Sequence, residues 1–158
     1  MKYIKYLVEE LFHKISVDEP NEEDVVRIIN NPENKSVIKK VINTIPDKRM
    51  QESMLMWAVW RLKKNIVIEL IKFGADCKYQ NGALESVSTY WNLKPNDDKQ
   101  ILAGEIAEIL HKNGANLGDG GLYTWSLVRK AKKYNLYELI PKLQELGYLP
   151  GINLALVT

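Results

Sequence analysis

The first 16 residues carry apolar side chains at every third or fourth position, the spacing that lines them along one side of a helix. These residues are Ile4, Leu7, Val8, Leu11, Phe12 and Ile15. Glu9 and Glu10 interrupt the continuous apolar run that a secretory signal needs. No stretch of the chain approaches the roughly 20 apolar residues of a membrane span. Because the polar side mixes both charge signs, we expect a helix docked on the domain rather than on a membrane surface.

Capping and breaking residues divide the next part of the chain into two helices. Asn21, followed by three acidic residues, predicts the start of a helix that ends before Pro32. A second helix is expected over residues 34–45, with Pro46 as its end. Two short helices joined by a tight connection form a helical hairpin.

A second pair of helices follows, and the sequence pattern at its end recurs twice farther along the chain. Asp47 can cap a long helix that reaches Leu62, and the helix after it closes at Gly74, which suits the left-handed position at a helix end. Similar endings recur at Gly114 and Gly147, after 40 and then 33 residues, so the middle unit carries about seven more residues. A repeated helix pair predicts a solenoid, in which each unit buries its apolar face by stacking on the next.

Apolar and small residues before the first of these endings follow a fixed spacing. They are Ser53, Leu55, Ala58, Val59, Ile66, Val67, Leu70, Ile71, Gly74, Ala75 and Asp76. This set resembles the ankyrin pattern T-P-L-H-x-A-A-x-x-G-x-x-x-I-V-x-x-L-L-x-x-G-A-D, which spans about 33 residues. The next unit keeps Ile106, Ala107, Leu110, Gly114, Ala115 and Asn116, and the last keeps Ser126, Ala131, Leu139, Ile140, Leu143 and Gly147. Met54 and Met56 replace the Pro and His of the T-P-L-H turn, so these turns must be held in another way.

The resemblance implies an all-α fold, an ankyrin-like helical-hairpin solenoid of three to four units with an N-terminal capping helix. The chain would form a single domain over 1–158. Residues 1–46 would form the N-terminal helix and a degenerate hairpin, 47–150 the ankyrin-like repeats, and 151–158 a C-terminal tail.

Composition and charge indicate one globular domain and argue against a disulfide or a metal site. The 158 residues include 46% hydrophobic and 27% charged residues, the composition of one globular domain. A formal net charge of +2 identifies no partner. Cys77 is the single cysteine, which excludes an internal disulfide and favours a cytoplasmic location, or a host cytosol if the protein is a delivered effector. With only His13 and His111 beside it, a metal site is not expected, and no cofactor is predicted.

No nucleotide-binding or hydrolase motif is present, and we therefore predict that the protein is not an enzyme. The glycine cluster at 118–121 lacks the Lys-Ser/Thr of a phosphate loop. The alternative is a small enzyme on a helical scaffold that uses Glu85, Glu105 and Glu108, which would require a closed polar pocket and a carboxylate of raised pKa.

Ankyrin geometry instead implies that the first helix of each unit lines a concave binding surface. The residues that would bind a partner there are Trp57, Trp60, Arg61, Tyr90, Lys130, Lys133 and Tyr134. Trp and Arg dominate interface hot spots, and the cationic residues favour another protein with an acidic surface. An adaptor, an inhibitor and an immunity-type binder all fit this description.

Two alternatives remain open at this stage. The helix that carries Trp57 and Trp60 is apolar almost all round, so burial of at least one tryptophan under the N-terminal helix is an equal possibility. The basic run 129–133 could contact nucleic acid, which we consider less favoured because stacking aromatic residues are not regularly interleaved with it.

Overall fold

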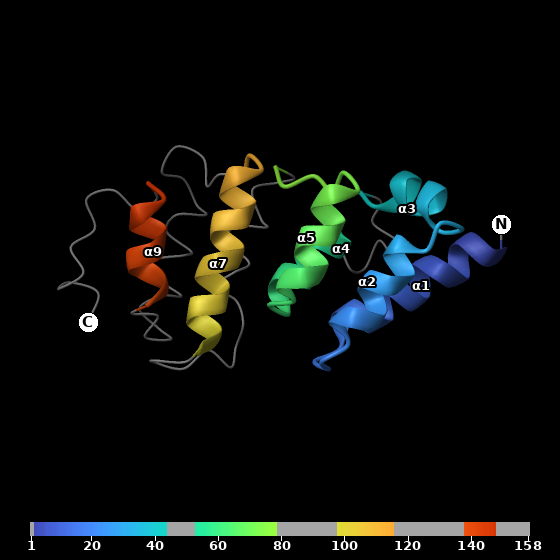
Figure 1. Cartoon of the computed structure of the whole chain (residues 1–158), viewed down its shortest axis with the longest axis horizontal. Coiled ribbons are helices and arrows are strands. Elements are labelled where there is room, and N and C mark those ends of the chain that lie inside the picture. The colour runs from blue at the N-terminus through green and yellow to red at the C-terminus, as the bar shows by residue number, and fades with distance from the viewer. Residues whose placement is uncertain (1, 44–52, 79–97, 116–137, 148–158) are drawn as a thin grey trace. The chain divides into compact units, whose positions relative to one another are not determined.

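A computed structural model describes residues 2–43, 53–78, 98–115 and 138–147. Within these ranges every regular element is a helix, so the predicted all-α class is confirmed (Figure 1). The chain divides into two compact units, Met1–Asp76 and Cys77–Thr158, called here the N-terminal and C-terminal units. The predicted single domain and its internal boundaries stay predictions.

The described helices are assigned to the two units as follows. The N-terminal unit contains α1 (Lys2–Ser16), α2 (Glu22–Asn30), α3 (Lys35–Val41), α4 (Met54–Trp60) and α5 (Lys64–Lys72). The C-terminal unit contains α7 (Asp98–Lys112) and α9 (Leu139–Glu145).

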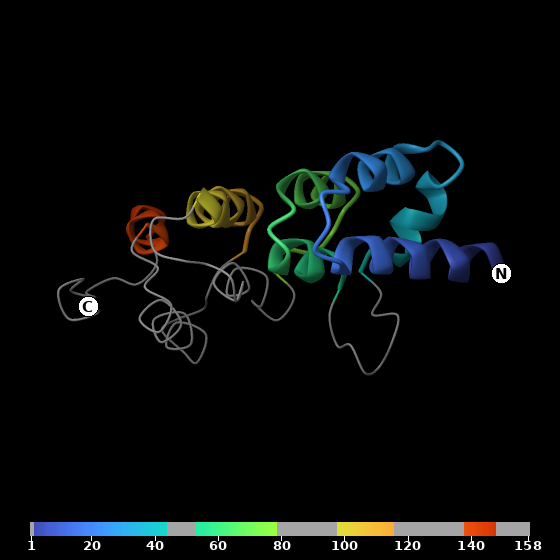
Figure 2. The same cartoon turned by 90° about the horizontal axis from the view of Figure 1, so that it is seen from below.

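Two helical hairpins form the N-terminal unit and lie in two layers. The first helices, α1 and α4, pack against each other, and the second helices, α2 and α5, do the same in the other layer (Figure 2). Each first helix also packs on its own second helix. The core between the layers consists of fully buried aliphatic side chains, among them Leu11, Ile15, Ile29, Leu55, Ile66 and Leu70. Their burial supplies the main stabilisation, because apolar surface removed from water contributes about 25 cal/mol per Å².

The pairing of helices differs from the expected hairpin over 21–45. Helix α2 does contact α3, but the hairpin that stacks on α4 and α5 is the one formed by α1 and α2. The apolar stripe of α1 explains this arrangement, since Leu11 and Ile15 are completely buried. The first helix thus belongs to a stacked pair.

Helix α3 is fastened at both ends by asparagine side chains. Asn34 is buried, donates to the carbonyl of Ile28 at 2.9 Å and accepts from the hydroxyl of Tyr3. Beyond the other end, Asn43 donates to the carbonyl of Gly74 at 3.1 Å and accepts from the backbone N–H of Asp76 at 2.8 Å. Hydrogen bonds therefore tie α3 both to α1 and to the end of α5.

The predicted helix endings are confirmed at all three glycines. Gly74, Gly114 and Gly147 have φ of 99°, 93° and 89°. At the first ending, the N–H of Ala75 bonds to the carbonyl of Leu70, and the N–H of Gly74 to that of Ile71, both at 3.0 Å. This pair of bonds is the Schellman motif, which requires a left-handed residue at the glycine position.

In the C-terminal unit, α7 and α9 pack against each other through a close approach at Gly104. A Cβ added to Gly104 would lie 3.1 Å from Cγ of Lys142 on α9. Gln100 of α7 is fully buried, and its side-chain oxygen accepts from the N–H of Glu138 at 3.1 Å, at the start of α9. Nearby, the ammonium of Lys142 pairs with Glu108 at 3.2 Å.

Replacing Gly74 tests the backbone requirement. Gly74→Ala is expected to lower the free energy of unfolding by about 1 kcal/mol, because an alanine is strained at positive φ. The new Cβ would meet no atom within 4 Å, so the loss of stability would come from backbone strain alone. Urea unfolding measures it. Gly74→Asn should lose less stability than Gly74→Ala, since asparagine tolerates this conformation. Equal stability of Gly74→Ala and the wild type would contradict the assignment.

Candidate functional site

Helix α4 presents one buried side and one partly exposed side. Ser53 begins it, with an extended backbone and a hydroxyl that accepts from the N–H of Met56 at 3.3 Å. The buried side is formed by Met54, Leu55, Ala58 and Val59. Met56, Trp57 and Trp60 lie on the other side and are half-buried. The long helix expected from Asp47 is therefore wrong, because the extended backbone at Ser53 interrupts any helix there.

The two tryptophans form a pair on this outer side. Their ring centroids lie 5.0 Å apart with an angle of 46° between the planes, a tilted geometry within the favoured range for aromatic pairs. Neither ring is fully buried, so the alternative of complete burial under α1 is wrong for both. Nε1 of Trp57 is itself buried and has no hydrogen-bond partner. An unpaired buried donor costs about 1–3 kcal/mol.

The turn after Trp60 places Arg61 beside the pair and reverses the chain. Leu62 follows with φ of 54°, and among the described residues it is the only one other than glycine with positive φ. Its N–H bonds to the carbonyl of Val59 at 3.0 Å, and the N–H of Lys63 to that of Ala58 at 2.9 Å. This is the same motif that ends α5, here with leucine in the left-handed position. The Leu62 side chain is buried, which offsets the backbone strain.

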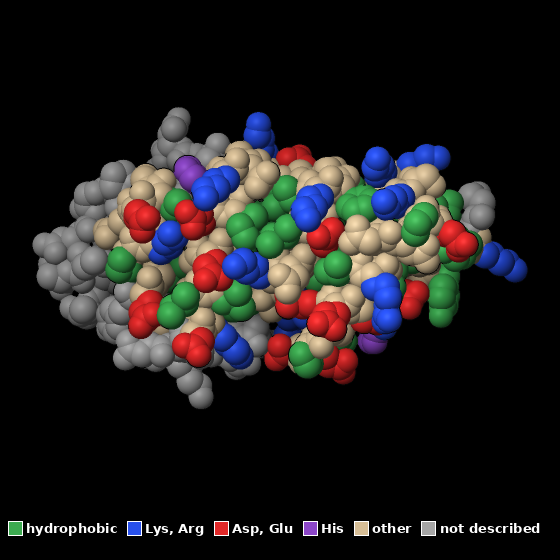
Figure 3. All heavy atoms as spheres, viewed as in Figure 1, with side chains coloured by type: hydrophobic (Ala, Val, Ile, Leu, Met, Phe, Trp, Pro, Cys, Tyr) green, Lys and Arg blue, Asp and Glu red, His purple; other side chains and the backbone are tan. Residues whose placement is uncertain are grey.

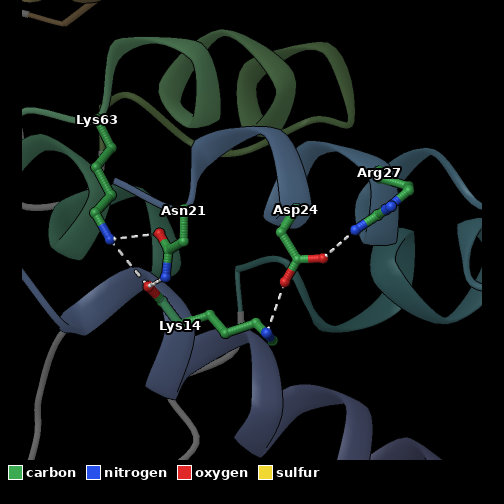
Figure 4. A network of polar contacts seen from close by, with 5 residues as sticks. All are labelled: Lys14, Asn21, Asp24, Arg27 and Lys63. Atoms are coloured by element: carbon green, nitrogen blue, oxygen red, sulfur yellow. Dashed lines mark hydrogen bonds and ion pairs between the residues drawn. The ribbon is translucent and has the colours of Figure 1, made fainter. Parts of the chain in front are cut away.

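Lys63 is a buried lysine at the centre of a polar network (Figure 4). Its ammonium donates to the carbonyls of Lys14 and Val17, at 2.9 and 2.7 Å, and to Oδ1 of Asn21 at 2.9 Å. Asn21 in turn donates to the carbonyl of Lys14 at 2.7 Å. Burial lowers the pKa of Lys63, because it disfavours the charged form, while nearby Glu22 opposes that shift.

The network changes the expected role of Asn21. Its side chain makes no capping bond to α2, contrary to the prediction from its position before three acids. Instead it connects the end of α1 to Lys63. Carbonyls at the end of a helix lack partners within the helix, so a cation is favoured there.

Asp24 continues the polar contacts from α2 toward α1. Its carboxylate pairs with the ammonium of Lys14 at 2.6 Å and with the guanidinium of Arg27 on the same helix. The hydrogen bond from Lys14, followed by that from Arg27, lowers the pKa of Asp24. The acid run at the start of α2 thus serves partly as an attachment to α1.

The structure brings together part of the predicted binding site. Trp57, Trp60 and Arg61 are neighbours on and just after α4. The other predicted residues, Tyr90, Lys130, Lys133 and Tyr134, lie outside the described residues, as does the basic run 129–133. Lys63 was not predicted as part of this region. In the sequence, a lysine between Arg61 and Lys64 resembles its solvent-exposed basic neighbours. Only its contacts with Lys14 and Val17, which are distant in sequence, show that it is buried.

Two carboxylates of the enzyme alternative, Glu105 and Glu108, lie on α7 and line one open hollow together with Glu138 and Lys142. Glu105 is exposed. Glu108 pairs with Lys142 and Lys112, and the hydrogen bond from Lys142 is the first cause that lowers its pKa. A general acid needs the opposite shift. Glu85 lies outside the described residues.

Metal-binding clusters and membrane-spanning helices are both absent from the described residues. No group of three or more His, Cys, Asp or Glu side chains there could hold a metal ion. No helix in these ranges is long and apolar enough to cross a membrane. Cys77, the single cysteine of the chain, is buried, whereas His13 and His111 are both exposed.

Comparison with known proteins adds no relative. Neither a scan against protein-family models nor searches of curated proteins and of solved structures return a match to the chain. The resemblance to ankyrin repeats therefore rests on the residue pattern alone.

Removing the Lys63 ammonium should destabilise the N-terminal unit. Lys63→Met keeps most of the apolar stem but removes the donor to the carbonyl of Val17 and to Oδ1 of Asn21, and one of the two donors to the carbonyl of Lys14. The expected loss is about 3 kcal/mol in the free energy of unfolding, measured by urea denaturation. Lys72→Met, at an exposed position of α5, is the control and should change stability by less than about 0.5 kcal/mol. Similar small effects of both changes would contradict the buried network.

The Asp24 contacts predict a pH dependence of stability. The folded-state pKa of Asp24 lies below 3.8, the ordinary value for an aspartate. The contribution of Asp24 is therefore fully present above that value and is lost as pH falls through the lower folded pKa. Asp24→Asn should be less stable than the wild type near neutral pH and should converge with it at the most acidic pH. Urea unfolding across the acid range measures this difference.

Glu23→Gln provides the control for this experiment, because it removes an exposed carboxylate one position earlier in the same helix. A stability difference between Asp24→Asn and the wild type that stays constant through the acid range would contradict the assigned role of the ion pairs.

Proposed function

We propose that this chain is a non-enzymatic protein–protein interaction module, an adaptor, inhibitor or immunity-type binder. Its partner would bind the concave face of an ankyrin-like stack, with Trp57, Trp60 and Arg61 at the centre of the contact. The observation that carries the proposal is the tryptophan pair on the outer side of α4, which stays partly accessible while the opposite side of the same helix is buried. Tryptophan is among the residue types that dominate binding hot spots.

The site is well suited to binding because it is held rigidly before a partner arrives. Helix α4 packs against both α1 and α5, and its two ends are fixed by the Ser53 cap and the Leu62 turn. The rings of Trp57 and Trp60 also contact each other. Binding to side chains that are already ordered loses less conformational entropy, so more of the contact energy appears as affinity.

The unpaired Nε1 of Trp57 adds a specific reason for a partner. The donor is buried in the free protein without an acceptor. A small shift of the ring on binding would allow a partner carbonyl or carboxylate to accept from it. That new bond would recover part of the cost of the unpaired group.

The cationic residue beside the pair favours an acidic partner. Arg61 follows Trp60 directly, and guanidinium groups next to aromatic rings are frequent in hot spots that recognise carboxylates. The proposed surface also includes four residues from later in the sequence, Tyr90, Lys130, Lys133 and Tyr134. A cytoplasmic location belongs to the same proposal, supported by the single cysteine, which can form no internal disulfide.

Two features support the ankyrin-like part of the proposal. The pair α4 and α5 stacks on the pair α1 and α2 layer by layer, and α5 ends in a glycine turn of the kind the repeat pattern requires. Helix α7 of the other unit closes at Gly114 in the same way, with Ala115 bonded back to Leu110. These are properties that stacked helical hairpins share.

A photo-crosslinking experiment tests the proposed site. A photoreactive phenylalanine analogue at position 56, on the outer side of α4, should crosslink a partner in the organism that produces the protein. The same analogue at exposed position 72 on α5 is the control and should not. With the captured partner purified, Trp60→Ala should raise the Kd at least about tenfold, as expected for a hot spot.

The matched variant for the affinity measurement is Lys72→Ala, which should leave the Kd within about twofold of the wild-type value. Far-ultraviolet circular dichroism of each variant checks that α4 is still folded. An unchanged Kd for a folded Trp60→Ala protein, or a partner captured equally from both positions, would contradict the proposed site.

A further inference from the structure

The first two turns of α1 expose apolar side chains beside lysines. Tyr3, Ile4 and Tyr6 are 53%, 38% and 67% exposed, and they are three of the four large exposed hydrophobic residues in the described part of the chain. Lys2 and Lys5, next to them in the sequence, are also exposed. Farther along the same helix, Leu11 and Ile15 are completely buried. Ile4 shares the apolar stripe with Leu11 and Ile15, so this stripe continues past the point where the neighbouring helices cover it.

Helix α3 adds more lysines to the same end of the N-terminal unit. Lys35, Lys39 and Lys40 are all exposed on it. The hydrogen bond from the Tyr3 hydroxyl to Asn34 fixes the start of α3 beside the start of α1. In Figure 3, basic and hydrophobic side chains lie next to each other over the part of the N-terminal unit where α1 and α3 lie, together with acidic side chains.

This surface is called here the lysine–tyrosine end and consists of Lys2, Tyr3, Ile4, Lys5, Tyr6, Lys35, Lys39 and Lys40. Residues 2–9 and 33–43, which contain it, hold five lysines against two carboxylates, Glu9 and Glu33. Of these carboxylates, Glu9 is 3.8 Å from the ammonium of Lys5. The local charge is therefore positive, although the whole chain is nearly neutral.

The other end of α1 has the opposite charge. Five acids fall within residues 18–24, from Asp18 to Asp24. Because α1 has 15 residues, its two ends are about 22 Å apart. That separation exceeds the Debye length of about 8 Å at physiological salt, so the basic end can interact with an anionic surface with little opposition from the acidic end.

We propose that the lysine–tyrosine end docks on an anionic membrane surface. Its charge is complementary to such a surface, to which clustered lysines are attracted. Tyrosine belongs to the residues that favour the boundary between headgroups and acyl chains, since its ring is apolar and its hydroxyl polar. Lysine stems can likewise lie along apolar surface while their charges stay in water. Tyr6 and Ile4 would enter the headgroup region while the lysines contact lipid phosphates and carboxylates.

An acidic protein would also attract the lysines. Tyr3 and Tyr6 are three residues apart on one side of α1, and Ile4 lies on its apolar stripe, so the exposed apolar side chains lie beside Lys2 and Lys5. Tyrosine rings next to lysines match the boundary of an anionic membrane, where the rings lie at headgroup level and the ammonium groups contact lipid phosphates. This combination favours a lipid surface, and binding to a soluble polyanion alone is an outcome of the test.

Mixed charges along α1 led to the expectation that this helix does not lie on a membrane. Along the helix, however, the acids begin only at Glu9, and the first two turns carry lysines alone. The proposed contact is at the end of the helix, and the rest of its apolar stripe stays buried in the unit.

Vesicle flotation of the full chain tests the proposal. Vesicles of phosphatidylcholine with about 30 mol % phosphatidylserine should bind the wild-type protein, and pure phosphatidylcholine vesicles should not. Binding should weaken strongly between about 0.1 and about 0.5 M salt. Lys39→Glu with Lys40→Glu should lower the partition coefficient at least about tenfold. Tyr6→Ser should also lower it, at unchanged charge.

The control is Lys72→Glu with Lys112→Glu, which changes the net charge equally at exposed positions that do not belong to the lysine–tyrosine end. It should reduce binding far less than the α3 variant. Circular dichroism and urea unfolding confirm that each protein folds. Equal loss in both double variants, or no binding to either vesicle, would overturn the proposal. So would binding to a soluble polyanion such as heparin without binding to vesicles.

Discussion

The buried ammonium of Lys63 is the interaction on which the arrangement of the N-terminal unit depends. It is supplied by the turn between α4 and α5, and its acceptors lie at the end of α1 and at the start of α2. A single side chain therefore joins both hairpins. Carbonyls at a helix end need donors, and a buried cation needs acceptors, so each group removes the desolvation cost of the other. The lowered pKa of Lys63 shows that burial is still unfavourable for the charge by itself.

The same turn determines where the tryptophan pair lies. For Lys63 to reach α1, the chain must reverse within two residues of Trp60, and this places Leu62 in the left-handed region. A glycine would relieve the strain of about 1–2 kcal/mol but would lose the buried leucine side chain. Strain of this kind persists where surrounding structure fixes it. Arg61 lies between the pair and this constrained residue, so the proposed binding surface is connected directly to the packing of the unit.

Sequence reasoning was most successful where one local rule decides the outcome. The glycine endings at Gly74 and Gly114 follow from the need for positive φ, which few other residues accept. The periodicity of α1 likewise predicts the burial of Leu7, Leu11, Phe12 and Ile15, but not the exposure of Ile4 on the same stripe. The start of α4 was missed because Asp47 and Ser53 are both good caps, and only the extended backbone at Ser53 decides between them. Lys63 could not be found at all, because its partners are 42 to 49 residues away and no local pattern marks them.

A difference in helix length explains why the N-terminal unit has an uncovered end. Helix α1 has 15 residues and its layer partner α4 has seven, so α1 extends about 12 Å beyond what α4 can cover. The Lys63 network fixes the end of α1 against the turn after α4, and the excess length must therefore emerge at the opposite end. Helix α3 contacts that end through Asn34 but leaves Tyr6 and Ile4 exposed. The exposed tyrosines and the half-buried tryptophans thus have one origin, the position of α4 along α1. They remain separate surfaces, because no described contact joins Tyr6 to Trp57 or Trp60, and a change that affects one need not affect the other.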